Sequence, residues 1–290
     1  MYRTFFGLQS YPFGVNPDPH FLCMTPHLKE VLACLDYGIR NRKGFVVLTG
    51  EVGTGKTTLL KALLSSLNGA DVVTSFVFNP RLDTLDFLEF MMADFGIEVR
   101  SRIKSQMLLQ LNQWLLTRHR AGTTAAVVID EAQNLSLELL EEVRLLTNLE
   151  TASEKLLQIV LSGQPELDDK LRLPETRQLR QRITLRCRTQ PLTQVDTHAY
   201  IAERLRIAGG SGTVFTPAAI DAIYEYACGI PRVTNLLCEH ALITAYVEEL
   251  RPIPASIIHE IATEFELEEI APVIARRPEN PMISQRTNNK

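Results

Sequence analysis

The sequence predicts an α/β protein in which helices flank a doubly wound parallel sheet, followed by a small all-helical second domain. Three observations support this prediction. A glycine-rich turn joins an apolar strand to a helix near residue 50. Strand-like apolar runs then alternate with helical patterns as far as about residue 190, which is typical of parallel sheets. After Pro191 only helical patterns occur, so we expect a separate helical domain there.

The glycine-rich turn has the pattern of a phosphate-binding loop. Its glycines let the backbone curl so that successive N–H groups face phosphate oxygens, and the following helix adds partial positive charge. We expect Lys56 to reach the β and γ phosphates and the Thr57 hydroxyl to coordinate Mg²⁺. The alternative is a turn without a ligand, which the lysine, the threonine and the preceding strand disfavour. The predicted ATP-binding residues are Gly50, Glu51, Val52, Gly53, Thr54, Gly55, Lys56, Thr57 and Thr58.

Apolar runs and helical periodicity place the other elements of the first domain. Continuous apolar runs suit parallel strands buried on both faces, whereas apolar residues at every third or fourth position indicate helices. The first 26 residues are rich in aromatics and prolines, and we expect an ordered loop with aromatic anchors. We predict strands at 45–49, 72–78, 125–129 and 156–161, helices at 27–42, 56–67, 83–95, 104–120 and 136–149, and a turn at Asn79-Pro80.

An acidic pair, Asp130 and Glu131, follows a fully apolar predicted strand. Open α/β sheets bind ligands at the carboxyl ends of their strands, where this pair lies. We expect Asp130 to hold Mg²⁺ through its water shell and Glu131 to polarise the water that attacks the γ-phosphate. The alternative is a pair that only caps the next helix. The phosphate-binding loop upstream favours the catalytic interpretation.

A polar turn, Ser162-Gly163-Gln164-Pro165-Glu166, follows the next predicted strand. Gln164, or less readily Ser162, is expected to hydrogen-bond the γ-phosphate or the attacking water. Glycine and proline bracketing a plain loop would give the same pattern, so this alternative stays open.

Arginines gather late in the first domain. Residues 172–188 contain six of them, and an arginine supplied by a neighbouring subunit can stabilise the charge of the transition state. Arg180 and Arg182 are the candidates for such an arginine finger, and the sequence does not choose between them. A solvated basic face or a nucleic-acid patch is the alternative. Arg232 lies in the first turn of a helix in the second domain, where it either reaches the nucleotide or is a surface arginine.

The predicted domain organisation has three parts. Residues 1–192 form the nucleotide-binding domain, residues 193–267 the helical domain, and residues 268–290 a disordered tail rich in proline and asparagine. The helices of the second domain are predicted at 193–208, 217–228, 231–249 and 254–266.

Composition limits the setting in which the protein works. The net charge of −4 gives no global basic field for nucleic acid. Five cysteines, an odd number without a C-x-x-C pair, argue against a disulfide framework and for a reducing compartment. No export signal or apolar window of about 18 residues is found, so we expect no membrane span. These features predict the cytoplasm, with attachment to the inner membrane through a partner protein as an option.

These motifs, in this order, resemble the AAA+ ATPases, a family of ring-forming ATP-driven machines. Residues 50–57 would be Walker A, residues 127–131 Walker B, Gln164 sensor 1 and Arg232 sensor 2. Closer similarity is to the ExeA/GspA type, the general secretion pathway protein A ATPases, with related ATPases of exosortase and polysaccharide loci. The segments that carry this likeness are Phe5-Phe6-Gly7-Leu8, Pro12-Phe13, Pro17-Asp18-Pro19, Tyr37-Gly38-Ile39, 44–58, 163–167, 177–183 and 229–232.

The resemblance implies a homo-oligomer, a ring or a filament, that hydrolyses ATP at subunit interfaces. It also implies a membrane-associated partner protein in a secretion or cell-envelope export system. Secretion members of this type continue into a transmembrane helix and a peptidoglycan-binding region, and this sequence ends at Lys290 with neither. Two alternatives for the chain therefore stay open, a piece of a longer membrane protein and a soluble relative. Two alternatives for the function also stay open, a DNA-bound helper ATPase of a transposition system and a nucleotide switch that barely hydrolyses ATP.

Overall fold

The computed structural model describes residues 1–290 apart from 15, 68–70, 79–80, 211–212 and 268–290. The described chain divides into two compact units, Asn16–Gln190 and Met1–Val15 with Pro191–Lys290. We call them the sheet unit and the helical unit. The predicted turn at residues 79–80 and the predicted tail lie outside the described residues.

The sheet unit contains a five-stranded parallel sheet with strand order β2-β3-β4-β1-β5. The three central strands are buried along their whole length, which explains why their sequences are continuously apolar rather than alternating. The parallel sheet predicted from the sequence is therefore confirmed. The strands are β1 Phe45–Thr49, β2 Val72–Val77, β3 Thr124–Ile129, β4 Leu157–Gly163 and β5 Leu185–Arg188.

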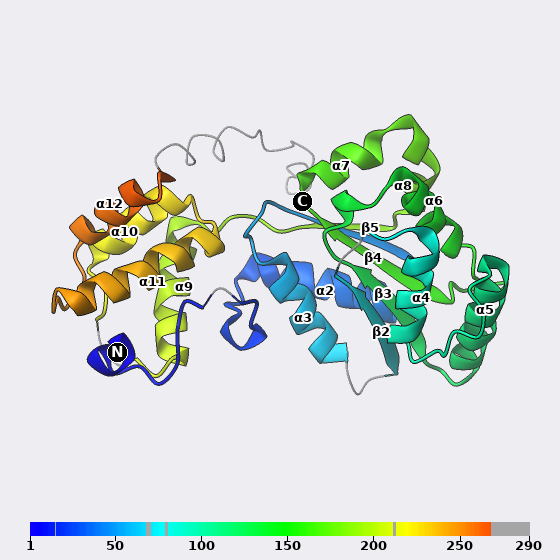
Figure 1. The fold of residues 1–290 in the computed structure, drawn as a ribbon, viewed down its shortest axis with the longest axis horizontal. Coiled ribbons are helices and arrows are strands. Elements are labelled where there is room, and N and C mark those ends of the chain that lie inside the picture. Colours follow the sequence, from blue (N-terminus) through cyan, green and yellow to red (C-terminus); the bar gives the residue numbers. More distant parts are fainter. Residues whose placement is uncertain (15, 68–70, 79–80, 211–212, 268–290) are drawn as a thin grey trace, which may run out of the picture. The chain divides into compact units, whose positions relative to one another are not determined.

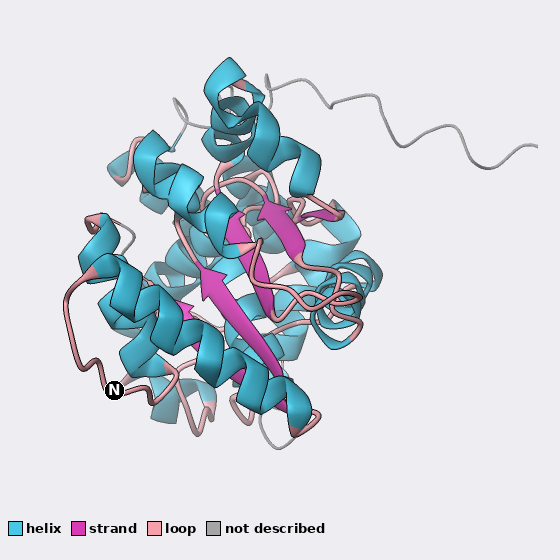
Figure 2. Cartoon of the chain, turned by 90° about the vertical axis from the view of Figure 1, so that its right-hand side faces the viewer, coloured by secondary structure: helices cyan, strands magenta, loops and turns pink. Residues whose placement is uncertain are grey.

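Helices cover both faces of this sheet, as Figures 1 and 2 show. Successive residues of each strand point to opposite faces, so every central strand contributes to two separate cores. One core joins the sheet to α2 Pro26–Arg40 and α3 Lys56–Leu67. The other joins it to α4 Thr84–Asp94, α5 Lys104–Arg120, α6 Leu137–Leu146, α7 Pro165–Arg172 and α8 Arg177–Arg182. The described part of the unit also contains short 3₁₀ turns at Pro19–Phe21, Ala132–Asn134 and Pro174–Thr176.

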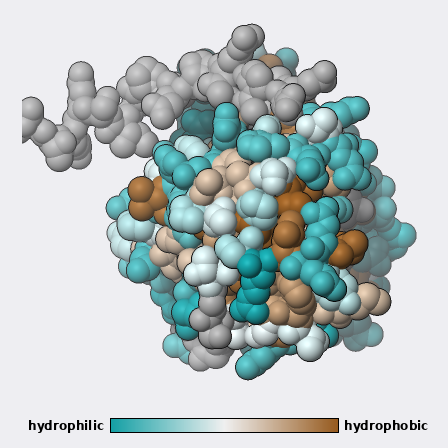
Figure 3. Space-filling model, turned by 90° about the vertical axis from the view of Figure 1, so that its left-hand side faces the viewer, coloured by the Kyte–Doolittle hydropathy of each residue, from teal (hydrophilic) through white to brown (hydrophobic). Residues whose placement is uncertain are grey.

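The helical unit contains α1 Tyr2–Phe6, α9 Gln194–Ile207, α10 Pro217–Ala227, α11 Pro231–Val247 and α12 Ala255–Glu264. Its surface carries apolar side chains set among polar ones (Figure 3), with Val195 and Val247 the most exposed of those beyond the N-terminal segment. Among the described residues, neither this unit nor the sheet unit has a helix long and apolar enough to cross a membrane.

The N-terminal segment differs from the prediction in two ways. We expected an irregular loop belonging to the nucleotide-binding domain, but residues 2–6 are helical and the segment belongs to the helical unit. Its aromatic anchors explain this grouping, because Tyr2 donates a hydrogen bond of 2.8 Å to Glu239 of α11 and Phe13 is fully buried. The buried Arg204 of α9 donates to the carbonyl of Pro12. These partners are far away in sequence, so no local pattern reveals them.

Candidate nucleotide-binding site

The loop between β1 and α3 is shaped by its glycines. Gly53 and Gly55 have φ angles of 79° and 91°, in the left-handed region that side chains disfavour. Gly50 is needed for another reason, since a Cβ there would lie 1.9 Å from the hydroxyl oxygen of Thr189. That threonine also contacts the loop directly, through a hydrogen bond of 2.8 Å between its hydroxyl and that of Thr54. The residue after β5 thus forms a side wall of the loop.

Lys56 begins α3 and folds back over the loop. Its ammonium group donates to the backbone carbonyls of Gly50 and Glu51, at 2.8 and 2.9 Å. Burial lowers the pKa of Lys56, and the carboxylates of Glu131 and Asp130 partly oppose this effect. A buried ammonium whose partners among the described residues are backbone carbonyls is suited to binding a polyanion, because phosphate oxygens would replace neutral acceptors with charged ones.

Thr57 and Asp130 meet at the carboxyl edge of the sheet. The Thr57 hydroxyl donates to Asp130 Oδ2 at 2.6 Å, while Asp130 Oδ1 accepts from Ser162 at 2.8 Å and from the backbone N–H of Glu131 at 3.0 Å. Neighbouring parallel strands bring these groups together, because β4 lies between β1 and β3. A hydroxyl and a carboxylate are hard oxygen donors of the kind Mg²⁺ prefers, with water and phosphate completing its shell. The residues present therefore fit an Mg²⁺-nucleotide site.

Glu131 lies beside that pair in an uncommon backbone conformation. Its φ of 54° is left-handed, which is uncommon for a residue with a side chain and is often found at functional sites. Its Oε2 accepts hydrogen bonds from the side-chain amides of Gln133, at 2.6 Å, and Gln164, at 3.2 Å. Gln164 is the N-cap residue of α7 and follows β4. The structure thus brings Glu131 and Gln164 together, and the predicted contact of Gln164 with a phosphate or a water stays a prediction.

Three contacts in this site were not anticipated. Gln133 was given no role, Ser162 binds Asp130 rather than lying free for a phosphate, and Thr189 was not considered at all. The position of Ser162 could have been inferred in part, because parallel strands place their carboxyl ends side by side and a buried hydroxyl needs a hydrogen-bond partner. Gln133 and Thr189 depend on turns whose shape the sequence does not fix.

The candidate arginines lie outside this cluster. Arg180 and Arg182 are exposed on α8, a short helix that the sequence analysis did not predict. Within the described chain, Arg182 donates to the Asn148 side chain at 3.1 Å, and Arg180 has no side-chain hydrogen bond or ion pair. Arg232 is exposed near the start of α11 in the helical unit. Their exposure leaves them accessible to another molecule.

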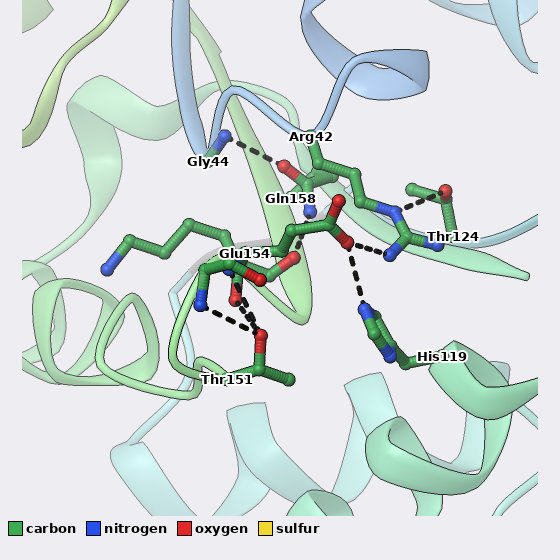
Figure 4. Close-up of polar contacts among 9 residues, drawn as sticks. Arg42, Gly44, His119, Thr124, Thr151, Glu154 and Gln158 are labelled. Carbon is green, nitrogen blue, oxygen red and sulfur yellow. Dashed lines mark hydrogen bonds and ion pairs between the residues drawn. The ribbon is translucent and has the colours of Figure 1, made fainter. Parts of the chain in front are cut away.

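The opposite edge of the sheet carries a polar cluster of a different kind (Figure 4). Arg42, which follows α2, pairs with Glu154 at 2.5 Å, and Glu154 also contacts His119 at 2.9 Å. Gln158 of β4 accepts from the backbone of Gly44 at 2.7 Å. Because the charges of Arg42 and Glu154 are satisfied by each other, this cluster ties helix ends to strand ends.

Comparison with known proteins agrees with this fold and loop. Residues 39–171 match a family model described as an AAA domain, a range that contains the loop, the acidic pair and Gln164. The fold resembles Cdc6p from Pyrobaculum aerophilum, with a TM-score of 0.66 and 18% identity over 84% of this chain and 68% of that one. It also resembles the ORC2 protein of Aeropyrum pernix, solved as ADPNP-ADP complexes, with a TM-score of 0.60 and 15% identity over 82% and 66%.

Fold, loop and family match together show that this chain contains an AAA domain with the fold of P-loop proteins. In sequence it is similar to General secretion pathway protein A from Aeromonas hydrophila, with 44% identity over 247 residues. The match covers 85% of this chain and 45% of that protein, so the chain spans a little under half the length of that relative. The predicted resemblance to the secretion type is thereby confirmed.

Proposed function

We propose that this protein binds ATP with Mg²⁺ and hydrolyses it at the subunit interfaces of a homo-oligomer, a ring or a filament. The observation that carries this proposal is the meeting of Lys56, Thr57, Asp130 and Glu131 at one edge of the sheet. A buried cation, two oxygen ligands and a carboxylate on one edge supply the parts of phosphoryl transfer to water.

Each residue then has a distinct task. Backbone N–H groups of the loop and Lys56 bind the phosphates, and Thr57 with Asp130 holds Mg²⁺. Bound Mg²⁺ neutralises charge on the phosphates and orients them. Glu131 polarises the attacking water, and Gln164 binds that water or the γ-phosphate. Arg232, which belongs to the helical unit, binds the nucleotide. The helical unit thereby responds to whether a nucleotide is bound.

Arg180 or Arg182 completes the site from a neighbouring subunit. Their exposure on α8 supports this role, because an arginine finger must be available to another chain. Mixing variants tests it: inactive Arg180→Ala or Arg182→Ala protein should regain activity with Lys56→Ala protein, since their intact halves can share an interface. Mixtures that remain inactive would leave both arginines without a catalytic role.

The similarity to General secretion pathway protein A supports a proposal for the biological role of ATP hydrolysis. We propose that the protein drives the assembly or operation of a secretion or cell-envelope export system. It would act in the cytoplasm and attach to the inner membrane through a partner protein. A DNA-bound role in transposition is the competing outcome, and it predicts ATP-dependent assembly on double-stranded DNA with a steep salt dependence. Light scattering after size exclusion, with and without ATP and DNA, separates the two.

Two substitutions test the hydrolysis itself. Lys56→Ala should abolish ATP binding, and Glu131→Gln should retain binding but lower turnover by about 10²–10⁴-fold, the usual contribution of a general base. Lys61→Ala, on the same helix, and Glu138→Gln, exposed on α6, are the matched controls. Binding is measured with a fluorescent ATP analogue and turnover by phosphate release. Unchanged affinity in Lys56→Ala, or normal turnover in Glu131→Gln, would refute the assignment.

A further inference from the structure

Gln133 lies two residues after Glu131, in the short 3₁₀ turn that follows β3. Both ends of its side-chain amide are engaged in the site. Its Nε2 donates to Glu131 Oε2 at 2.6 Å, and its Oε1 accepts from the backbone N–H of Gln164 at 3.1 Å. One amide thus connects the carboxylate that faces water with the start of α7.

The surroundings of Gln133 hold that amide in place. Its backbone carbonyl accepts a hydrogen bond from Lys170 of α7 at 2.5 Å, and burial lowers the pKa of that lysine. The absence of a side chain at Gly163 makes room for the amide, because a Cβ there would lie 2.8 Å from Gln133 Oε1. A side chain fixed by its amide, its carbonyl and the adjoining backbone has little freedom to reorient.

The two oxygens of the Glu131 carboxylate differ in their hydrogen bonds. Oε2 accepts from the amides of both Gln133 and Gln164, whereas Oε1 has no hydrogen bond within the described residues. An ionised carboxylate has acceptor capacity on both oxygens. Binding one of them therefore fixes the rotation of the group and leaves the other to accept a proton from water.

We propose that Gln133 is a positioning residue, which holds the Glu131 carboxylate with Oε1 free for the attacking water and couples it to the Gln164 backbone. This inference rests on the proposed ATPase function. Removing the amide would let the carboxylate rotate, and general base catalysis depends on geometry before it depends on pKa. ATP binding would be unaffected, because the phosphates are held by the loop and by Lys56.

Steady-state ATPase kinetics on Gln133→Ala provide the first test. We expect kcat to fall by about 10-fold or more, while KM and the affinity for a fluorescent ATP analogue stay within about twofold of the wild type, the split expected of a group that acts only in the chemical step. Gln113→Ala, exposed on α5, is the matched control and should behave as the wild type. An unchanged kcat in Gln133→Ala, or a loss of ATP affinity equal to the loss of kcat, would overturn the proposal.

Gln133→Glu tests the same geometry with a side chain of nearly the same shape. Its carboxylate cannot donate a hydrogen bond to Glu131, unlike the amide that it replaces. We expect kcat to fall as in Gln133→Ala, while KM and the affinity for the fluorescent ATP analogue stay within about twofold of the wild type. A wild-type kcat in Gln133→Glu would overturn the proposal. Two other results would contradict the proposed function itself rather than the role of Gln133. They are a wild type that binds ATP without turning it over and a Glu131→Gln variant with normal turnover.

Discussion

The contact between Gly50 and Thr189 makes one substitution especially informative. Gly50→Ala introduces a Cβ 1.9 Å from the Thr189 hydroxyl oxygen and 2.9 Å from its carbonyl oxygen. Ordinary contact begins at 3.4 Å, so a displacement of about 1.5 Å (3.4 − 1.9) is needed at the first atom. Rotating the threonine side chain would relieve that overlap but break its hydrogen bond to Thr54. The carbonyl group of Thr189 is less free to move away, because the N–H of the same residue donates a hydrogen bond of 2.8 Å to the carbonyl of Thr49.

The expected loss of stability follows from these two effects. Overpacking costs about 1–3 kcal/mol, and the lost hydroxyl hydrogen bond about 0.5–1.5 kcal/mol. Together they destabilise the sheet unit by about 2–4 kcal/mol, which lowers its Tm by about 5–15 °C for a unit of this size. Calorimetry measures this change, and titration with a fluorescent ATP analogue should show weakened binding, because the loop itself is displaced.

Controls decide whether the threonine is the cause. Gly14→Ala is the matched control, since a Cβ there meets nothing within 4 Å. Thr189→Ala alone should be destabilised by about 1 kcal/mol, and the double variant Gly50→Ala/Thr189→Ala should be more stable than the sum of the two changes. A Gly50→Ala protein with wild-type Tm and ATP affinity would refute the reasoning, and so would strict additivity in the double variant.

Three further predictions concern other parts of the chain. Ser162→Ala removes a hydrogen bond to Asp130. The Mg²⁺ concentration needed for half-maximal hydrolysis should therefore rise several-fold, and an unchanged Mg²⁺ titration would contradict this. Lys104→Met leaves the buried carboxylate of Glu142 unpaired and should destabilise the sheet unit by about 1–3 kcal/mol in urea denaturation, whereas adding Glu142→Leu should restore much of it. Tyr2→Phe breaks the bond to Glu239 and should lower the Tm of the helical unit by a few degrees; an unaltered calorimetric transition would show the bond to be unimportant.

Much of the sheet unit could be predicted because its signals are local. The central strands are buried on both faces, so they appear as continuous apolar runs, and β1 begins and ends as predicted. The short helices α7 and α8 were missed because eight and six residues rich in charge do not establish a helical period. The N-terminal segment was assigned to the wrong unit, since its anchors bind residues about 190 to 240 positions away.

The candidate site shows the same division. Lys56, Thr57, Asp130 and Glu131 follow from motif and strand order, because parallel strands place their carboxyl ends side by side. Gln133 does not follow, because its role depends on a left-handed Glu131 and on the room beside a glycine. Such contacts are set by backbone dihedral angles in a turn, which residue types alone leave undetermined.

Thr189, which forms the side wall of the loop, sets the C-terminal limit of a fragment that keeps the loop intact. The sheet ends with β5 at Arg188, but the contact with Thr54 is made one residue later. Only Gln190 then remains before the second segment of the helical unit starts at Pro191. A fragment ending at Arg188 would therefore keep all five strands and yet leave the loop open on one side. The shortest piece that carries an intact loop wall ends at Thr189, past the last strand.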